Sequence, residues 1–145
     1  MSALAYLDTS VVAKRYLREP GSDEFDDFLA RRESAAISRL TWLELRCLLA
    51  RRRRNREIDA RQQRRVLAAF EEDVGQGFLE VHPLEDRHVI NAGDLLMRLA
   101  RHPLRTLDCI HLAIATAIRA EVFATADGVL AKAAATLRFN VARFG

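Results

Sequence analysis

The chain has 145 residues, of which half are hydrophobic and 30% are charged, and its formal net charge is +3. This length and balance predict one soluble globular domain over residues 1–145. They exclude a membrane-spanning protein, because the longest apolar stretch, CIHLAIATAI, is too short to cross a bilayer. The N-terminus lacks the basic region of a signal peptide, so we expect a cytoplasmic protein.

The predicted elements alternate between strands and helices. In chain order they are a strand at 3–7, a helix at 10–17, a helix at 21–32 with Ser22 as its N-cap, a strand at 34–38, helices at 41–55 and 57–74, a strand at 78–84, helices at 86–101 and 107–120, a strand at 121–127, a helix at 128–137 and a strand at 139–144. This order predicts an α/β fold: a three-layer sandwich with a central parallel sheet of four to five strands.

The basic and thiol side chains bear on two questions: whether the protein binds phosphate, and whether it needs zinc or a disulfide. Lys14 and Lys132 are the only lysines among 23 basic residues. Arginine suits bidentate phosphate contacts, but a genome biased toward arginine produces the same composition, and both explanations stay open. Cys47 and Cys109 have no CxxC spacing and lie in apolar contexts, so we expect two buried thiols and neither a zinc site nor a required disulfide.

Four acids fall near the predicted carboxyl edge of the sheet. Asp8 follows the first strand and Asp127 follows the fourth, while Glu44 lies about one helical turn after the second strand. Asp108 lies in the first turn of the helix at 107–120, which is apolar on nearly every face and is therefore expected to be buried. Ligands bind beyond the carboxyl ends of parallel strands, so all four side chains are expected to reach one cleft.

Each acid also has a purely structural explanation. Asp8 and Asp127 could be N-caps, Thr41-x-x-Glu44 fits a capping box, and Asp108 could complement a helix dipole. Taken together, the acids favour a metal site. Carboxylates that converge in a cleft repel one another unless a cation neutralises them, and hard divalent cations prefer oxygen ligands.

Four segments carry a family resemblance. YLDTSVVAKRY, SRLTWLELR, RTLDCIHLAIA and FATADGVLAKAA resemble, in order and spacing, the motifs of PIN-domain ribonucleases, and most closely those of the VapC-like toxins of bacterial toxin–antitoxin pairs. The resemblance covers nearly the whole chain and implies a PIN-like fold. It implies an endoribonuclease that hydrolyses RNA phosphodiester bonds with water activated by Mg²⁺ or Mn²⁺. Carried over residue by residue, it implies catalytic and metal-binding roles for Asp8, Glu44, Asp108 and Asp127, with Thr9 and Thr125 as supporting hydroxyls.

The resemblance also implies partners. It suggests a homodimer and a separately encoded antitoxin whose segment lies along an apolar groove and blocks the acids. The mixed apolar and arginine-rich helices over residues 10–70 are candidates for that groove. Family members often place a glycine after the last helix, and this chain has Arg138 there, which questions the local turn and not the active site.

Two further features have competing interpretations. His111 lies three residues after Asp108, and we interpret it as a packed, hydrogen-bonded histidine and not as a ligand. The arginine run ARRRRNR at 50–56 is either a solvated helix end or a contact for RNA or an acidic partner segment.

Other functions remain as alternatives. One is a catalytically inactive RNA-binding or regulatory PIN-like module, which the four acids argue against. Another is a phosphoacceptor signalling domain that binds Mg²⁺, which would want a paired acid after the first strand and a lysine after a late strand. A haloacid-dehalogenase-type phosphatase would want an acid where Ser10 stands.

Overall fold

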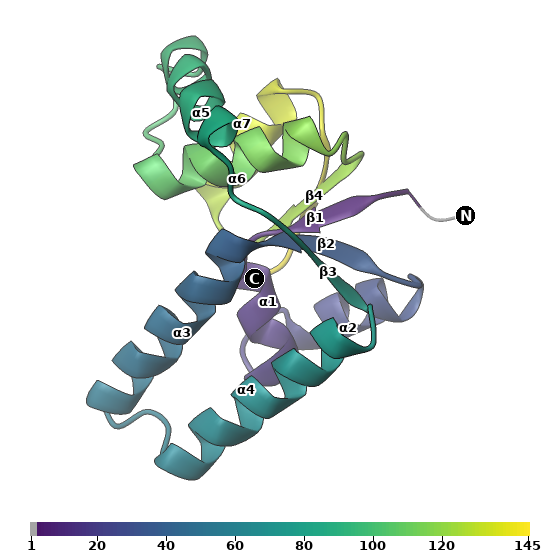
Figure 1. Ribbon diagram of the computed structural model, residues 1–145, viewed down its shortest axis with the longest axis vertical. Helices are drawn as coiled ribbons and strands as arrows, with labels where there is room; N and C mark the ends of the chain where they lie inside the picture. The colour runs from purple at the N-terminus through teal and green to yellow at the C-terminus, as the bar shows by residue number, and fades with distance from the viewer. Residues whose placement is uncertain (1–2) are drawn as a thin grey trace.

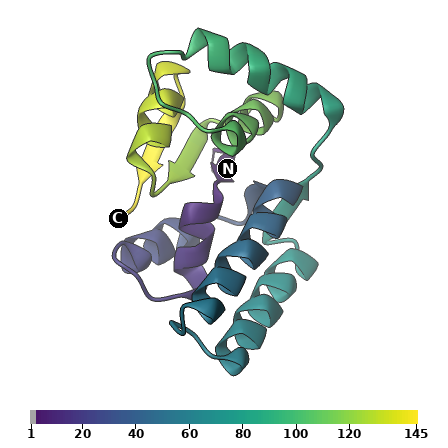
Figure 2. The ribbon, with the colours of Figure 1, turned by 90° about the vertical axis from the view of Figure 1, so that its left-hand side faces the viewer.

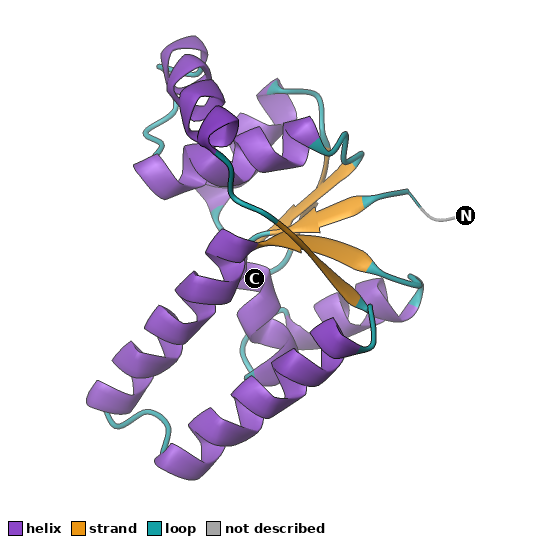
Figure 3. Ribbon diagram, in the orientation of Figure 1, coloured by secondary structure: helices purple, strands orange, loops and turns teal. Residues whose placement is uncertain are grey.

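The structure, a computed structural model, describes residues 3–145, and all twelve predicted elements are present there within a few residues of their expected bounds. Figures 1 and 3 show them in space. They are β1 (Ala5–Leu7), α1 (Thr9–Tyr16), α2 (Ser22–Ala30), β2 (Ala35–Ser38), α3 (Arg39–Arg54), α4 (Ala60–Gly75), β3 (Leu79–His82), α5 (Asp86–Arg98), α6 (Thr106–Ala117), β4 (Val122–Thr125), α7 (Gly128–Thr136) and β5 (Asn140–Arg143).

The five strands form one sheet in the order β3-β2-β1-β4-β5, and every neighbouring pair is parallel. This confirms the predicted parallel sheet. The next strand in the sequence, β2, lies on one side of β1, and β4 lies on the other side. The strand order therefore reverses at β1. Such a reversal opens a crevice at the carboxyl edge of the sheet.

Side chains that alternate along the strands fill two separate cores. Tyr6 and Phe123 face the cluster covered by α5, α6 and α7, whereas Leu7, Ile37 and Ala124 face the cluster covered by α1 to α4. Successive strand residues point to opposite faces, so strands covered on both sides need apolar residues throughout. Figures 1 and 3 show the two helical layers on either side of the sheet, which confirms the three-layer sandwich.

The helices α3 and α4 form an antiparallel pair that extends away from the sheet, as Figures 1 and 2 show from two sides. Leu45 and Leu49 of α3 and Phe70 of α4 are fully buried between the layers. No helix within residues 3–145 is both long enough and apolar enough to cross a membrane.

The start of α2 differs from the prediction. Gly21, with φ of 90°, is the N-cap residue, and Ser22 is the first helical residue. The Ser22 hydroxyl instead accepts a hydrogen bond from the Glu19 N–H (2.9 Å) and donates one to the Leu17 carbonyl (3.1 Å). The prediction that Ser22 is the N-cap was therefore wrong, because its hydroxyl stabilises the preceding turn and does not cap the N-terminus of α2.

The turn after α7 keeps its left-handed conformation without a glycine. Arg138 has φ of 71°, its N–H donates to the Ala135 carbonyl (2.9 Å), and the next N–H, of Phe139, donates to the Ala134 carbonyl (3.1 Å). A left-handed conformation costs roughly 1–2 kcal/mol for a residue with a Cβ. The arginine in place of glycine therefore lowers the stability of the fold slightly but leaves the conformation of the turn unchanged.

We expect Arg138→Gly to raise the free energy of unfolding by about 1 kcal/mol, because glycine adopts this conformation without the Cβ clash. Denaturant unfolding measures the change. Arg31→Gly is the matched control, since Arg31 ends α2 with a negative φ of −89° and gains nothing from glycine. Equal or lower stability of Arg138→Gly relative to wild type would contradict this account of the turn.

Candidate active site

An open cleft of about 380 Å³ lies beyond the carboxyl ends of β1 and β4. Its walls come from the turns after β1 and β4, one face of α3 and the first turns of α6. The cleft is lined by Asp8, Thr9, Ser10, Glu44, Cys47, Leu48, Arg51, Arg105, Leu107, Asp108, His111 and Asp127. The structure thus brings the four acids of the sequence analysis to one cleft.

Asp8 is 4% exposed and is both the N-cap of α1 and part of the cleft wall. Its Oδ1 accepts hydrogen bonds from the Ser10 hydroxyl (2.6 Å) and the Val11 N–H (3.2 Å), and its Oδ2 accepts one from the Thr125 hydroxyl (2.6 Å). Burial raises the pKa of Asp8 even though the charge of His111 and these hydrogen bonds act in the opposite direction. A charged Asp8 is therefore costly here unless a cation compensates it.

Asp127 and Asp108 are each anchored through one carboxylate oxygen. Asp127 Oδ1 accepts from the N–H groups of Val129 (2.8 Å) and Leu130 (3.1 Å) at the start of α7. Asp108 Oδ2 accepts from the Arg105 N–H (3.1 Å) at the start of α6. In the described part of the chain, the second oxygen of each carboxylate has no hydrogen-bond partner. Both acids act as caps, and each has an oxygen left for a ligand.

Glu44 does not belong to a capping box, so that structural explanation of Glu44 was wrong. The N-cap of α3 is Ser38, and Thr41 is its capping-box partner, because the helix begins at Arg39 and not at Thr41. Glu44 therefore lies beyond the first turn, where its side chain is free to reach the cleft.

The carboxylate of Glu44 is held by two side chains from other elements. Its Oε1 accepts a hydrogen bond from the Thr9 hydroxyl (2.8 Å) and lies 2.5 Å from His111 Nε2. Desolvation alone would raise the pKa of Glu44, but the hydrogen bond and charge of His111 and the bond from Thr9 lower it overall. Glu44 is therefore an ionised acid at neutral pH.

His111 is 3% exposed, and both of its ring nitrogens have partners. Nε2 faces Glu44, and Nδ1 lies 2.6 Å from the Tyr6 hydroxyl. The prediction of a packed, hydrogen-bonded histidine is confirmed.

The donor set of the cleft suits a hard divalent cation. The candidate donors are oxygens apart from His111 and the Cys47 thiol, and Mg²⁺ prefers oxygen ligands while keeping several of its waters. Across residues 3–145, no three His, Cys, Asp or Glu side chains stand close enough together to form a complete metal-ligand set. The fit therefore rests on the partnerless oxygens of Glu44, Asp108 and Asp127, on buried Asp8, and on water for the remaining ligands.

Two arginines line the same cleft as the acids, Arg51 from α3 and Arg105 from the turn before α6. Arg52 is bound to Glu19 and Glu57, and Arg53 donates to Gln63. The arginine run thus has two kinds of member: Arg52 and Arg53 stabilise the fold, whereas Arg51 and Arg54 are exposed.

One thiol differs from the prediction. Cys109 is buried as expected, but Cys47 is exposed and lines the cleft. Glu44, Cys47, Leu48 and Arg51 recur at helical spacing and form the face of α3 that borders the cleft.

Ser10 is a site residue that the sequence analysis missed. Its hydroxyl donates to Asp8 and accepts from the Ala126 N–H (2.9 Å), which joins the turns after β1 and β4. The hydroxyl two residues after an acid, at the end of a buried strand, was the available signal. The proximity of Ala126 depends on the pairing of β1 with β4, which local sequence does not show.

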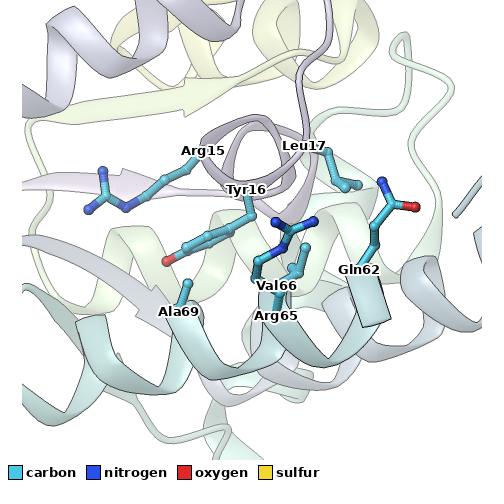
Figure 4. Close-up of a pocket in the computed structure, with 7 residues that line it drawn as sticks. All are labelled: Arg15, Tyr16, Leu17, Gln62, Arg65, Val66 and Ala69. Carbon is cyan, nitrogen blue, oxygen red and sulfur yellow. The ribbon is translucent and has the colours of Figure 1, made fainter. Parts of the chain in front are cut away.

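A second cavity, of about 350 Å³, lies between α1 and α4 (Figure 4). Tyr16 and Val66 form part of its wall, and Gln62 and Arg65 supply polar groups. No carboxylate lines it, so it offers no ligands for a hard cation.

Comparisons with known proteins agree with this architecture. Residues 5–136 match the PIN domain family. No curated protein sequence matches the chain.

Several solved structures share the fold. VapC20 of Mycobacterium tuberculosis, described as a sarcin-ricin loop cleaving toxin, has 18% identity and a TM-score of 0.71 over 89% of this chain and 94% of that chain. FitAcB from Neisseria gonorrhoeae has 18% identity and a TM-score of 0.68 over 98% of this chain and 97% of that chain. VapBC2 from Rickettsia felis, bound to a promoter DNA fragment, has 15% identity and a TM-score of 0.68 over 98% and 99%. Because residues 5–136 of the 145 match the family, the chain belongs to the PIN domain family.

Proposed function

We propose that this protein is a Mg²⁺- or Mn²⁺-dependent endoribonuclease, the toxin of a toxin–antitoxin pair, and that residues 1–145 act as a single nuclease domain. One observation carries the proposal: Asp8, Glu44, Asp108 and Asp127 line one cleft of a PIN-family chain. The solved structure of VapC20, which has the same fold and is described as a sarcin-ricin loop cleaving toxin, supports the substrate class.

The four carboxylates would hold the divalent ion in this cleft together with water, because no three acidic, histidine or cysteine side chains of residues 3–145 stand close enough to bind it by themselves. The chemistry that such an ion supplies is activation of water as a nucleophile and stabilisation of charge on the phosphate. The chain itself orients the ligands. The Ser10 and Thr125 hydroxyls fix both oxygens of Asp8, and the Thr9 hydroxyl fixes one oxygen of Glu44. The cationic side chains of Arg51 and Arg105, which line the cleft, would contact RNA phosphates.

The phosphoacceptor alternative is less well supported by the cleft. Neither lysine of the chain lines it: Lys14 donates to the Pro20 carbonyl (2.7 Å), and Lys132 is exposed on α7. An inactive RNA-binding module would not need four acids in one cleft. Cleavage of RNA by the purified protein, with Mn²⁺ and with a chelator, distinguishes the nuclease from both alternatives.

The partners proposed are an RNA substrate, a cognate antitoxin and a second copy of the chain. Solved structures with this fold include VapBC2 and a toxin–antitoxin complex from Klebsiella pneumoniae, which supports an antitoxin partner. The exposed apolar side chains of α5, among them Ile90 (61% exposed) and Met97 (79% exposed), support association with another chain. Rescue of growth by co-expression of the adjacent gene product tests the toxin assignment.

We expect replacement of Arg51 and Arg54 by glutamine to weaken binding similarly for all RNAs. If each contacts one phosphate, the slope of log K against log salt should flatten by roughly 1.4, at about 0.7 per phosphate for single strands. Binding measured by fluorescence anisotropy across a salt series gives the slope.

The matched control replaces Arg31 and Arg138 by glutamine. These two exposed arginines follow α2 and α7, at the sheet edge opposite the cleft, and their loss changes the net charge equally. An equal change of slope in both double variants would show a general effect of charge. An unchanged slope in the Arg51 and Arg54 variant would assign these residues to a solvated helix end or to the partner protein.

A further inference from the structure

A chain of hydrogen bonds runs from the centre of the sheet to the wall of the cleft. The Tyr6 hydroxyl of β1 donates to Ser38 Oγ (2.9 Å) and lies 2.6 Å from His111 Nδ1, while His111 Nε2 lies 2.5 Å from Glu44 Oε1. Tyr6 and Ser38 are fully buried. These hydrogen bonds thus join β1, α6 and α3, three elements that are far apart in the sequence.

Both hydrogen bonds to the Glu44 carboxylate end on the same oxygen. Oε1 receives His111 Nε2 and the Thr9 hydroxyl, whereas Oε2 has no hydrogen-bond partner among residues 3–145. Because a carboxylate only accepts, Nε2 carries a proton and donates a hydrogen bond to Glu44. The carboxylate is therefore fixed through one oxygen, and the other is available to the cleft.

Packing does not require the Tyr6 hydroxyl. The Tyr6 ring stacks on Phe123, with centroids 5.6 Å apart and an interplanar angle of 26°, and phenylalanine would keep that contact. A buried hydroxyl needs partners, and apolar packing alone would favour phenylalanine at this position. The partners that Tyr6 has are the N-cap of α3 and the histidine that holds Glu44.

We propose that Tyr6 and His111 are positioning residues that hold Glu44 with one oxygen directed to the cleft. This inference rests on the proposed function, since it gives the hydrogen bonds among Tyr6, His111 and Glu44 a role at that same site. Tyr6 fixes the ring of His111, and His111 fixes the carboxylate. Partners that orient a metal ligand from behind it typically change metal affinity or activity by 10–100-fold when they are removed.

The test is Tyr6→Phe, with Mn²⁺ affinity measured by calorimetry in the absence of RNA and with the kinetics of RNA cleavage. We expect Mn²⁺ affinity or kcat to fall by roughly tenfold to a hundredfold. The KM for RNA should stay unchanged, because Tyr6 is buried and does not reach the substrate. His111→Gln, which retains an N–H donor, should keep more Mn²⁺ affinity than His111→Leu.

Tyr16→Phe is the matched control. Tyr16 is also a largely buried tyrosine whose hydroxyl donates to an acid, Asp73 (2.5 Å), but its ring lies against the second cavity and not the cleft (Figure 4). Its loss should leave Mn²⁺ affinity and kcat unchanged.

The possible outcomes distinguish a failure of the positioning role from a failure of the proposed function. Wild-type Mn²⁺ affinity and kcat in Tyr6→Phe, or equal losses in Tyr6→Phe and Tyr16→Phe, would overturn the positioning role while leaving the proposed function intact. If wild type neither binds Mn²⁺ nor cleaves RNA, the proposed function fails and the positioning role falls with it.

Discussion

Asp8→Asn is expected to lower RNA cleavage by roughly a thousandfold while the protein stays folded. Asparagine has nearly the shape of aspartate, its oxygen can still accept from the Ser10 hydroxyl and the Val11 N–H, and its NH₂ group can donate to the Thr125 hydroxyl. It lacks the negative charge that a hard cation requires. Asp108→Asn should behave in the same way. Initial rates with a labelled RNA measure the loss.

The same substitution is expected to stabilise the metal-free protein, increasingly so at higher pH. Burial raises the pKa of Asp8, so the folded state binds more protons than the unfolded state over the interval between the two pKa values. Wild type therefore loses stability as the pH rises through that interval, and Asp8→Asn does not. Melting curves in EDTA at several pH values measure the difference.

Asp73→Asn provides a matched control for this pair of effects. Asp73 also accepts several hydrogen bonds, from Arg15 (2.8 Å and 3.3 Å) and Tyr16, but it does not line the cleft. We expect it to lower stability and to spare cleavage, the reverse of Asp8→Asn. Full activity in Asp8→Asn, or equal inactivation of both variants, would contradict the assigned role of Asp8.

Mn²⁺ is expected to stabilise the folded protein by about 2.7 kcal/mol at a concentration one hundred times its Kd. The four carboxylates line one cleft only in the folded state, so the unfolded chain offers no comparable site. For a chain of this length, the melting temperature should rise by roughly 5–10 °C. Thermal melts across a Mn²⁺ titration measure the shift.

Asp8→Asn should show little of this stabilisation, and Asp73→Asn should show all of it. A melting temperature that does not move across a wide Mn²⁺ range would count against a metal site in the cleft. An equal rise in wild type and Asp8→Asn would place the binding elsewhere.

The order of elements was predictable because each strand is a short apolar run and each helix has a helical apolar pattern. Where helices begin was less predictable. Ser38 and Thr41 are both good capping residues, and local sequence does not decide between them. In the structure Ser38, at the buried end of β2, is the cap. The helix therefore begins two residues earlier than predicted, and Glu44 lies outside the capping box, on the face that borders the cleft.

The partners within the site depend on tertiary structure. That His111 would be packed and hydrogen-bonded followed from its apolar helix, but its contacts with Tyr6 and Glu44 come from elements 105 and 67 residues away. Cys47 is exposed because α3 extends beyond the sheet, with one face on the cleft. The four acids were identifiable because their positions relative to the strand ends follow directly from the sequence.

The most direct test of the central claim, that these carboxylates hold the ion on which RNA cleavage depends, is one cleavage time course. Wild type and Asp8→Asn, purified in parallel, act on the same labelled RNA in EDTA and then after addition of excess Mn²⁺. The account predicts no cleavage by either protein in EDTA, and rapid cleavage by wild type alone once Mn²⁺ is added. Undiminished cleavage by wild type in EDTA, or equal cleavage by the two proteins, would contradict it.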